Sequence, residues 1–479
     1  MSQASVETSS QKSFFAENKK LIGFVVCMVV GFYMWFGPPI GGLTPHSQHV
    51  LASVVVLILG LMFEIMSIGN LVLLWAVFLI ITRLEKPSVA LDGFVNETTW
   101  LVLGAFMIGQ AAIKTNLAKR IAYNVMSVAG DSYRRLTLML YVVGWILGAF
   151  IPSGTARMAI IFPIFVGLLE AFRAQPDSPE SLDLMLQVKW AFSTGGPSIA
   201  WLTGSLVNPI IMSALTKITG QTVSWSQWAV WMFIPTITIA ALMWYSTTRL
   251  TGAKPKIEGG LTQIRDELKT LGEMRKEEKA AAVWMAVAVL LWATGDLTKI
   301  NPAWSAMLVG LLLFAPYIGV LKNKDLKELD WGMFLFCGGA ISLAAVISEA
   351  QIDAWAVKAL LHPLIAPLSQ FGTIGSFTGL WLFGYFMHFI IPSGTATVAA
   401  VAPLNLQYAV ANGLDPTLTA FVTNFANRPF IFPYQIMSIM LLWGFAKPSI
   451  GSAARVLGIQ SVLWLVWSLL MIAYLDIFI

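Results

Sequence analysis

Long apolar stretches recur along the whole chain and predict an all-α membrane protein. A helix needs about 20 apolar residues to cross the hydrocarbon core of a bilayer. Two apolar regions, 182–218 and 415–446, are too long for one straight helix and contain Gly, Asn and Pro, so each is expected to cross once as a broken helix. About eleven crossings are predicted in total. The complete stretches lie near 21–37, 48–66, 69–83, 98–115, 227–248, 280–295, 302–318, 331–348 and 457–477.

Two further apolar segments, 136–171 and 374–412, carry the letters Pro-Ser-Gly-Thr in their middle. A full span would need unbroken helix there, because unsatisfied backbone groups are costly in lipid. Both segments are therefore predicted to be re-entrant hairpins, which enter the membrane and return to the same side.

The composition supports a membrane protein. Hydrophobic residues make up 57% of the chain and charged residues 11%, against about 45–50% and 25% in soluble domains. A water-soluble enzyme of this size is excluded, and the formal charge of +5 suits basic cytoplasmic loops better than a nucleic-acid partner. Cys27 and Cys337 lie in apolar runs, so neither a disulfide framework nor a metal–thiolate site is expected.

One charged segment, 249–279, divides the chain into two halves, 21–248 and 280–479. It holds eight Lys and Arg residues and has apolar residues at helical spacing, which indicates a cytoplasmic amphipathic linker. The polar tail 1–20 is predicted to lie in the cytoplasm as well, because Lys19 and Lys20 precede the first span.

Basic residues also orient the hairpins. Arg134, Arg135 and Arg173 flank the first hairpin and place its base in the cytoplasm. The flanks of the second hairpin, 366–373 and 411–416, contain no Lys or Arg, so its base is expected outside. The two hairpins thus enter from opposite faces, and the C-terminus is predicted to lie outside the cell, with a bacterial inner membrane as the expected location.

The two hairpins are copies of each other. Ile-Pro-Ser-Gly-Thr-Ala occurs letter for letter at 151–156 and at 391–396, and Gly144 matches Gly384 at the same offset of 240 residues. Because the charges give the halves opposite orientations, the chain is predicted to be an inverted-topology repeat. Such repeats are typical of secondary transporters with a substrate site near the bilayer midplane.

The repeated motif suits an anion. Pro152 and Pro392 end the first arm of each hairpin, and the second arm begins with free backbone N–H groups at the positive end of a helix dipole. Hydroxyl groups add donors, and glycine lets a ligand approach the backbone. Two such tips that meet would bind an anion with two acidic ends. The predicted tip residues are Ser153, Gly154, Thr155, Ser393, Gly394 and Thr395.

With these motifs the chain resembles the divalent anion:sodium symporters, which have a Ser-Asn-Thr motif at each of two hairpin tips. The resemblance spans nearly the whole sequence. It implies transport of di- and tricarboxylates or sulfate, a homodimer in the bilayer, and a transport domain that slides against a scaffold domain in an elevator motion. It also implies that the broken helices contribute to substrate binding, through Thr203, Asn208, Arg428, Phe432 and Pro433.

Departures from the family pattern concern sodium. The motif asparagines are Gly154 and Gly394 here, and Ala149 and Phe389 stand where sodium-coupled members tend to offer a hydroxyl four residues before the motif serine. Side-chain oxygen for a sodium ion is therefore sparse, although residual sodium sites near Ser153 and Ser393 stay open. No other metal and no cofactor is expected.

Fixed cations stand near the tips instead. Arg157 follows the first tip by one turn, and Arg428 lies in the second broken helix, where a charge is costly unless it meets an anion or water. Arg157 could equally snorkel or pair with an acidic residue, and a lone His388 is more often structural than proton-coupling. The sequence predicts anion exchange without a strict need for sodium, with sodium-coupled symport as the alternative.

Two other function classes fit less well. A cation/proton antiporter would need buried carboxylates beside the tips, and neither Ser-Gly-Thr neighbourhood has one. An intramembrane hydrolase using Ser153 or Ser393 would need a paired base at each site, and only His388 is near. The anion itself is left open, because hydroxyls and N–H groups bind carboxylate, sulfonate and sulfate alike.

Overall fold

The computed structural model describes residues 14–130, 132–254, 260–391 and 393–479, which form helices, turns and loops without a strand. Five helices are long and apolar enough to cross a membrane, and a sixth candidate is a pair bent by 67°, α6 and α7. The all-α membrane architecture is thus confirmed. The remaining predicted crossings consist of shorter or interrupted helices.

The described residues up to 254 contain thirteen α-helices. Four of them, over 45–63, 68–81, 97–114 and 225–251, begin and end within about three residues of a predicted apolar stretch. The thirteen are α1 (Phe14–Phe36), α2 (Pro45–Phe63), α3 (Ile68–Ile81), α4 (Pro87–Ala90), α5 (Asp92–Val95), α6 (Glu97–Lys114), α7 (Leu117–Ser127), α8 (Tyr133–Gly148), α9 (Gly154–Ala171), α10 (Pro179–Lys189), α11 (Gly196–Ile199), α12 (Val207–Thr219) and α13 (Trp225–Thr251).

The linker and the second half are also built from helices and the loops between them. They contain α14 (Gly260–Leu271), α15 (Lys276–Ala293), α16 (Gly295–Thr298), α17 (Pro302–Leu312), α18 (Trp331–Glu349), α19 (Ile352–Ala356), α20 (His362–Ser369), α21 (Gly372–Ile390), α22 (Gly394–Ala411), α23 (Pro416–Ala426), α24 (Met437–Ala446) and α25 (Ile450–Leu475).

Both hairpins form at the predicted residues. α8 and α9 are the arms of the first, and α21 and α22 are the arms of the second. In each hairpin the motif serine is the N-cap of the second arm, because its side chain accepts a hydrogen bond from the backbone N–H three residues later. Pro152 precedes the first N-cap, as predicted, whereas Pro392 lies outside the described residues.

The two broken helices are interrupted where Gly, Asn and Pro cluster. In the first, α10 runs into a π-helical turn at Trp190–Thr194, and α11 and a 3-10 turn at Leu202–Gly204 separate it from α12. In the second, α23 ends at Ala426 and α24 starts at Met437, with a 3-10 turn at Pro433–Gln435 between them. We call these interruptions break 1 (190–206) and break 2 (427–436).

The linker holds a helix that lies against α7. Leu268 and Leu271 of α14 pack on the core, which agrees with the predicted amphipathic character. Arg120 of α7 fastens the end of α14, donating to the carbonyl of Gly272 at 2.8 Å and to Glu278 of α15 at 3.0 Å. The sequence did not predict α7 or α19 as separate helices.

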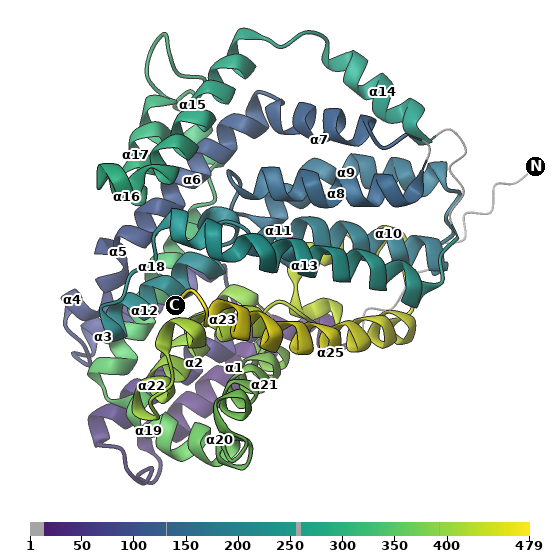
Figure 1. The fold of residues 1–479 in the computed structure, drawn as a ribbon. Coiled ribbons are helices and arrows are strands. Elements are labelled where there is room, and N and C mark those ends of the chain that lie inside the picture. Colours follow the sequence, from purple (N-terminus) through teal and green to yellow (C-terminus); the bar gives the residue numbers. More distant parts are fainter. Residues whose placement is uncertain (1–13, 131, 255–259, 392) are drawn as a thin grey trace, which may run out of the picture.

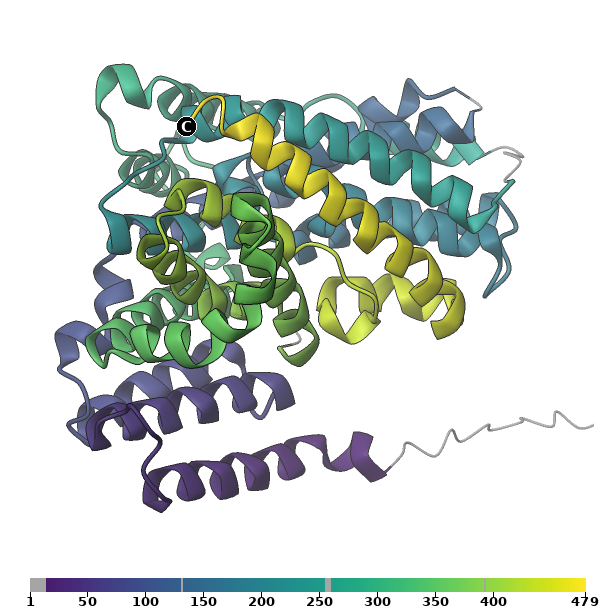
Figure 2. The same cartoon turned by 60° about the horizontal axis from the view of Figure 1, so that its bottom comes forward.

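The helices of the first hairpin and break 1 form one side of the molecule. Figure 1 shows α8, α9, α10 and α13 stacked beside one another, and Figure 2 shows α25 lying along α13. α1 lies at the periphery and packs on α2.

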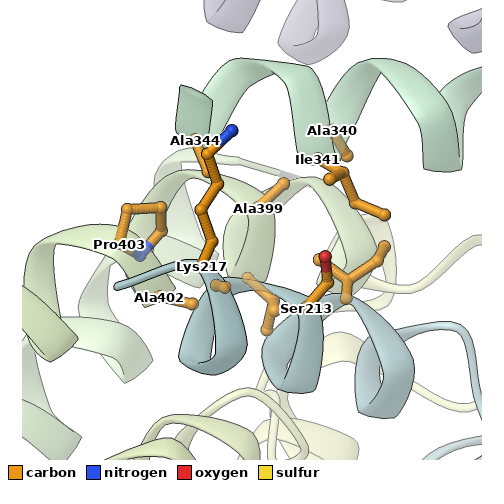
Figure 3. A pocket seen from close by; sticks show the side chains of 11 residues that line it. Ser213, Lys217, Ala340, Ile341, Ala344, Ala399, Ala402 and Pro403 are labelled. Atoms are coloured by element: carbon orange, nitrogen blue, oxygen red, sulfur yellow. The ribbon is translucent and has the colours of Figure 1, made fainter. Parts of the chain in front are cut away.

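A different contact joins the repeat regions to α18. Figure 3 shows α12, α18 and α22 facing one another mainly through small side chains around a narrow gap. Ala340 and Ala344 of α18 lie opposite Ala399 and Ala402 of α22. Side chains this small allow close approach of the three helices.

Candidate substrate site

The first hairpin tip opens into a cavity. Ser153, Gly154 and Ala156 are half-buried and Thr155 is exposed. The cavity has a volume of about 360 Å³, and Ser153 and Thr155 line it together with α6 and the segment before α18. Its lining also includes two acidic residues, Glu328 and Asp330, of which Glu328 accepts a hydrogen bond from Gln110 at 2.7 Å.

The second tip is less open. Ser393, Gly394 and Thr395 are half-buried. None of these residues lines the cavity at the first tip. The predicted arrangement in which both tips share one pocket stays a prediction.

Arg157 ties the first tip to break 1. Its side chain is fully buried. It donates to three backbone carbonyls: that of Ile151, that of Phe192 at 2.9 Å and that of Gly204 at 2.9 Å. Its Nη2 has no hydrogen-bond partner among the described residues, so this is a free donor beside the tip.

The equivalent residue in the second repeat is neutral. Thr397 lies 240 residues after Arg157, and its hydroxyl donates to the carbonyl of Ile391 at 3.1 Å. Ile391 is the counterpart of Ile151. Both repeats therefore hold the same tip carbonyl with a side-chain donor, but only the first uses a cation for it.

Arg428 ties break 1 to break 2. It is 2% exposed, and all five of its N–H groups have neutral acceptors. Nη2 donates to Asn208 Oδ1 at 2.5 Å and to Asn424 Oδ1 at 2.6 Å, and Nη1 donates to the hydroxyls of Ser198 and Ser205. Arg428 is thus held in place by the protein and has no free donor in this state.

The two residues predicted in the first broken helix, Thr203 of break 1 and Asn208 at the start of α12, also belong to this internal network. Thr203 donates to the carbonyl of Ala149 at 2.9 Å, and Asn208 donates to the carbonyls of Ser198 and Trp201. Both side chains are buried. They position break 1 against the first tip and Arg428 rather than facing the cavity.

The predicted residues around break 2 lie in an aromatic and polar cluster. His388 contacts the carbonyl of Gln435 through Nε2 at 3.2 Å, which fits a structural role, although its Nδ1 has no partner in the described chain. Phe432 is half-buried and packs edge-on to Phe389. Pro433 begins the 3-10 turn.

Two residues that sequence reasoning missed adjoin the motif glycines. Asn427 donates from Nδ2 to the carbonyl of Gly394 at 2.7 Å, and its buried Oδ1 has no partner among the described residues. A Cβ on Gly394 would lie only 3.0 Å from that Nδ2. At the first tip, a Cβ on Gly154 would meet Ser193 of break 1 at 3.4 Å. The glycines thus let polar groups of the breaks approach the tips closely.

Neither buried arginine meets a carboxylate. None of the ion pairs among the described residues includes Arg157 or Arg428. The predicted pairing of Arg157 with an acidic residue is therefore not found, and no snorkelling is possible for a fully buried head group. The first tip and the two breaks are thus connected through cations that meet no carboxylate among the described residues, whereas the neutral Asn427 connects break 2 to the second tip.

Comparison with known proteins identifies the family. Residues 18–478 match the model of the sodium:sulfate symporter transmembrane region. The chain belongs to this family. The members of the sodium:sulfate symporter family found by comparison are transporters, which confirms the resemblance and excludes an enzyme.

Relatives in this family match over most of their length. The putative malate transporter YflS of Bacillus subtilis is 27% identical, with 86% of each chain covered. The sodium-dependent dicarboxylate transporter SdcS of Staphylococcus saprophyticus is 25% identical over 93% of this chain and 91% of its own. The chloroplastic dicarboxylate transporter 1 of Spinacia oleracea is 24% identical over 84% and 71%.

A solved structure shares the fold. The YdaH transporter of Alcanivorax borkumensis superposes with a TM-score of 0.53 over 96% of this chain and 97% of its own, at 14% identity. The similarity thus covers both halves of the chain and the linker between them.

Proposed function

We propose that this protein exchanges one divalent carboxylate-class anion for another across a membrane without requiring sodium. Relatives named as malate and dicarboxylate transporters support the substrate class. The hydroxyls and helix N-termini at the tips suit carboxylate oxygens, because such donors stabilise negative charge.

One observation carries the exchange mode: Arg157 beside the first tip and Arg428 between the two breaks are buried and contact only neutral oxygens. A buried cation without an acid is strongly disfavoured unless an anion compensates it. A dianion at the tips would supply the missing charge. The empty carrier would keep two uncompensated positive charges, so it would cross the hydrocarbon poorly, and return would require a second anion.

The tip carbonyls support the absence of a sodium requirement. Sodium is a hard cation, and such ions bind oxygen ligands. At the first tip the carbonyls of Ala149 and Ile151 already accept hydrogen bonds from Thr203 and Arg157. At the second tip the carbonyls of Ile391 and Gly394 accept from Thr397 and Asn427. In the proposed mechanism the guanidinium of Arg157, fixed on the Ile151 carbonyl, takes the place of a mobile cation at the first tip, and neutral donors occupy the other three oxygens.

The proposed movement is an elevator motion. The two hairpins and the two breaks would travel as one body, because hydrogen bonds join them. Arg157 joins the first tip to break 1, Arg428 joins break 2 to the first broken helix, and Asn427 joins break 2 to the second tip. The small side chains between α22 and α18 would form part of the sliding surface. We further propose a homodimer in a bacterial inner membrane, with the N-terminus in the cytoplasm and the C-terminus outside.

Sodium-coupled symport is the second candidate. It is favoured by the family description and by SdcS, a relative named as sodium-dependent. In that case sodium would bind near Ser153 and Ser393 through backbone oxygens.

Reconstituted liposomes distinguish the two. Vesicles preloaded with malate are expected to take up labelled malate rapidly in choline buffer, and empty vesicles are expected to take up little. A panel of succinate, citrate and sulfate would define the anion class, with protein-free vesicles as the blank. Uptake that rises steeply with external sodium and gains nothing from preloading would refute exchange. A complete lack of uptake and counterflow across the panel would refute anion transport.

A further inference from the structure

Lys189 is a third buried cation that the proposed mechanism does not use. It is the last residue of α10, and its side chain is fully buried. Its Nζ has no hydrogen-bond partner in the described part of the chain. It lies over two aromatic faces instead, 2.8 Å from the ring centroid of Trp190 and 4.0 Å from that of Phe430.

An aromatic cage holds an ammonium group but does not neutralise it. The faces of Trp and Phe attract a cation through their quadrupoles, whereas a carboxylate would cancel its charge. No ion pair among the described residues includes Lys189. Of the two acidic residues of α10, Glu180 lies in the first turn at the opposite end of the helix, and Asp183 accepts hydrogen bonds from Tyr133 and Thr251. No carboxylate among the described residues therefore cancels the positive charge of Lys189, and this charge can act on a ligand that binds nearby.

Lys189 lies beside the two breaks that adjoin the proposed anion site. The π-helical turn that follows Lys189 presents the Phe192 carbonyl to Arg157 and places Ser193 beside Gly154. On its other side, Phe430 follows Arg428 by two residues in break 2.

The contacts of the three cations converge on the breaks. Lys189 lies over Phe430 of break 2, and Arg157 donates to the Phe192 carbonyl of break 1. Arg428 donates to the hydroxyls of Ser198 and Ser205 in break 1. Lys189 thus belongs to the same cationic group as the two arginines, behind the breaks rather than at the tips.

We infer that Lys189 is a specificity-determining residue, whose fixed charge favours anions with three negative charges over anions with two. This inference rests on the proposed function. Two arginines balance a dianion, and a third cation balances one further carboxylate. In general, a unit charge about 10 Å away at an effective dielectric constant of about 20 changes the affinity for one extra ligand charge by about 15-fold, so an effect of about tenfold is expected from Lys189.

A matched ligand pair isolates this effect. Propane-1,2,3-tricarboxylate and glutarate share a five-carbon chain and differ by the central carboxylate, and both are fully ionised at pH 8. Apparent affinities of purified full-length protein are measured by competition against labelled substrate in liposomes. The quantity of interest is the ratio of the tricarboxylate affinity to the glutarate affinity. In Lys189→Met this ratio is expected to fall about tenfold or more relative to wild type.

Three controls make the result specific. Lys189→Arg retains the charge and is expected to retain the ratio. Lys358→Met removes an exposed lysine far from the breaks and should leave the ratio unchanged. Thermal unfolding checks that Lys189→Met is folded, and Lys189→Gln serves as a second neutral variant. A loss of packing would weaken both ligands alike, and only a charge effect changes the ratio.

The outcomes separate the two proposals. An unchanged ratio in both neutral variants, with wild-type exchange intact, would overturn the role of Lys189 and leave the exchange proposal standing. A ratio that falls in Lys189→Arg as well would also overturn it, because the charge would then not be the cause. Wild-type protein that neither binds nor exchanges either anion would overturn the proposed function and this inference together.

Discussion

Replacing Arg157 by threonine tests the fixed cation most directly, because the second repeat already contains that replacement. Thr397 is the counterpart of Arg157 and holds the Ile391 carbonyl at 3.1 Å. A threonine at position 157 can hold the Ile151 carbonyl in the same way. It cannot reach the carbonyls of Phe192 and Gly204, which Arg157 now binds at 2.9 Å each.

The size of the effect follows from the lost groups. Each buried carbonyl that loses its donor costs about 1–3 kcal/mol, so the free energy of unfolding is expected to fall by about 2–6 kcal/mol. In the proposed mechanism the substrate would accept a hydrogen bond from Nη2, which has no partner among the described residues, so the variant is expected to lose this charged donor. A hydrogen bond to a charged group contributes about 1.5–3 kcal/mol, which corresponds to about a 10- to 150-fold loss of affinity.

The assay is malate exchange in preloaded liposomes, run in parallel in choline and in sodium buffer. In choline, Arg157→Thr is expected to show a 10- to 150-fold higher half-saturation concentration. Sodium should restore part of the activity, because the freed carbonyls of break 1 become available to a mobile cation. Arg455→Thr, which removes an exposed arginine on α25, is the matched control. Wild-type exchange by Arg157→Thr in choline would refute the role of the fixed cation.

Three further predictions concern the tips, the topology and the ion pair between Lys114 and Asp325. Ser153→Ala and Ser393→Ala should each weaken substrate binding about tenfold or more and cost about 1 kcal/mol of stability through the lost N-cap; unchanged affinity in calorimetry for both would remove the tips from the site. A cysteine at Asn412 should react with an impermeant maleimide from outside and one at Gln175 only from the cytoplasm, and labelling of both from one side would contradict the inverted repeat. Burial raises the pKa of Asp325, but hydrogen bonds from Lys114 and from the Lys322 amide outweigh it and hold that pKa below its ordinary value. Its stabilising contribution is therefore present above about pH 4 and lost as the pH falls through the folded-state pKa, so the difference in melting temperature between wild type and Asp325→Asn should shrink progressively as the pH falls below 4; a constant difference would exclude the ion pair as its source.

Much of the fold could be predicted because the bilayer imposes strong rules on the sequence. α13, α18 and both hairpins begin and end within about three residues of the predicted apolar stretches. The amphipathic α7 escaped prediction because its polar face removes the signal of a continuous apolar run. The sharp bend between α6 and α7 occurs at Asn116, which adopts a left-handed conformation with a φ of 66°. A single asparagine in a sequence does not predict such a bend.

The site was harder to predict because its polar side chains form hydrogen bonds with one another across large distances in the sequence. The sequence singled out Arg428 as a buried charge, but its partners Asn208 and Asn424 lie 220 and 4 residues away and meet only in the folded chain. Lys189 was overlooked although an ionisable residue inside an apolar membrane segment is a functional signal by default. Asn427 gave no signal at all, because asparagine in a helix break is usual.

The difference between Arg157 and Thr397 explains how a symmetric repeat can carry an asymmetric charge. Both side chains hold the same carbonyl of their tip, so the tip geometry does not depend on the cation. The arginine is longer and reaches break 1 as well, which fixes its guanidinium between tip and break. Its charge must therefore travel with the first hairpin and break 1, whereas a bound sodium ion could dissociate on either side. In the proposed exchange, the empty and the loaded carrier both contain this positive charge, so the anion that neutralises it would be the condition for each crossing.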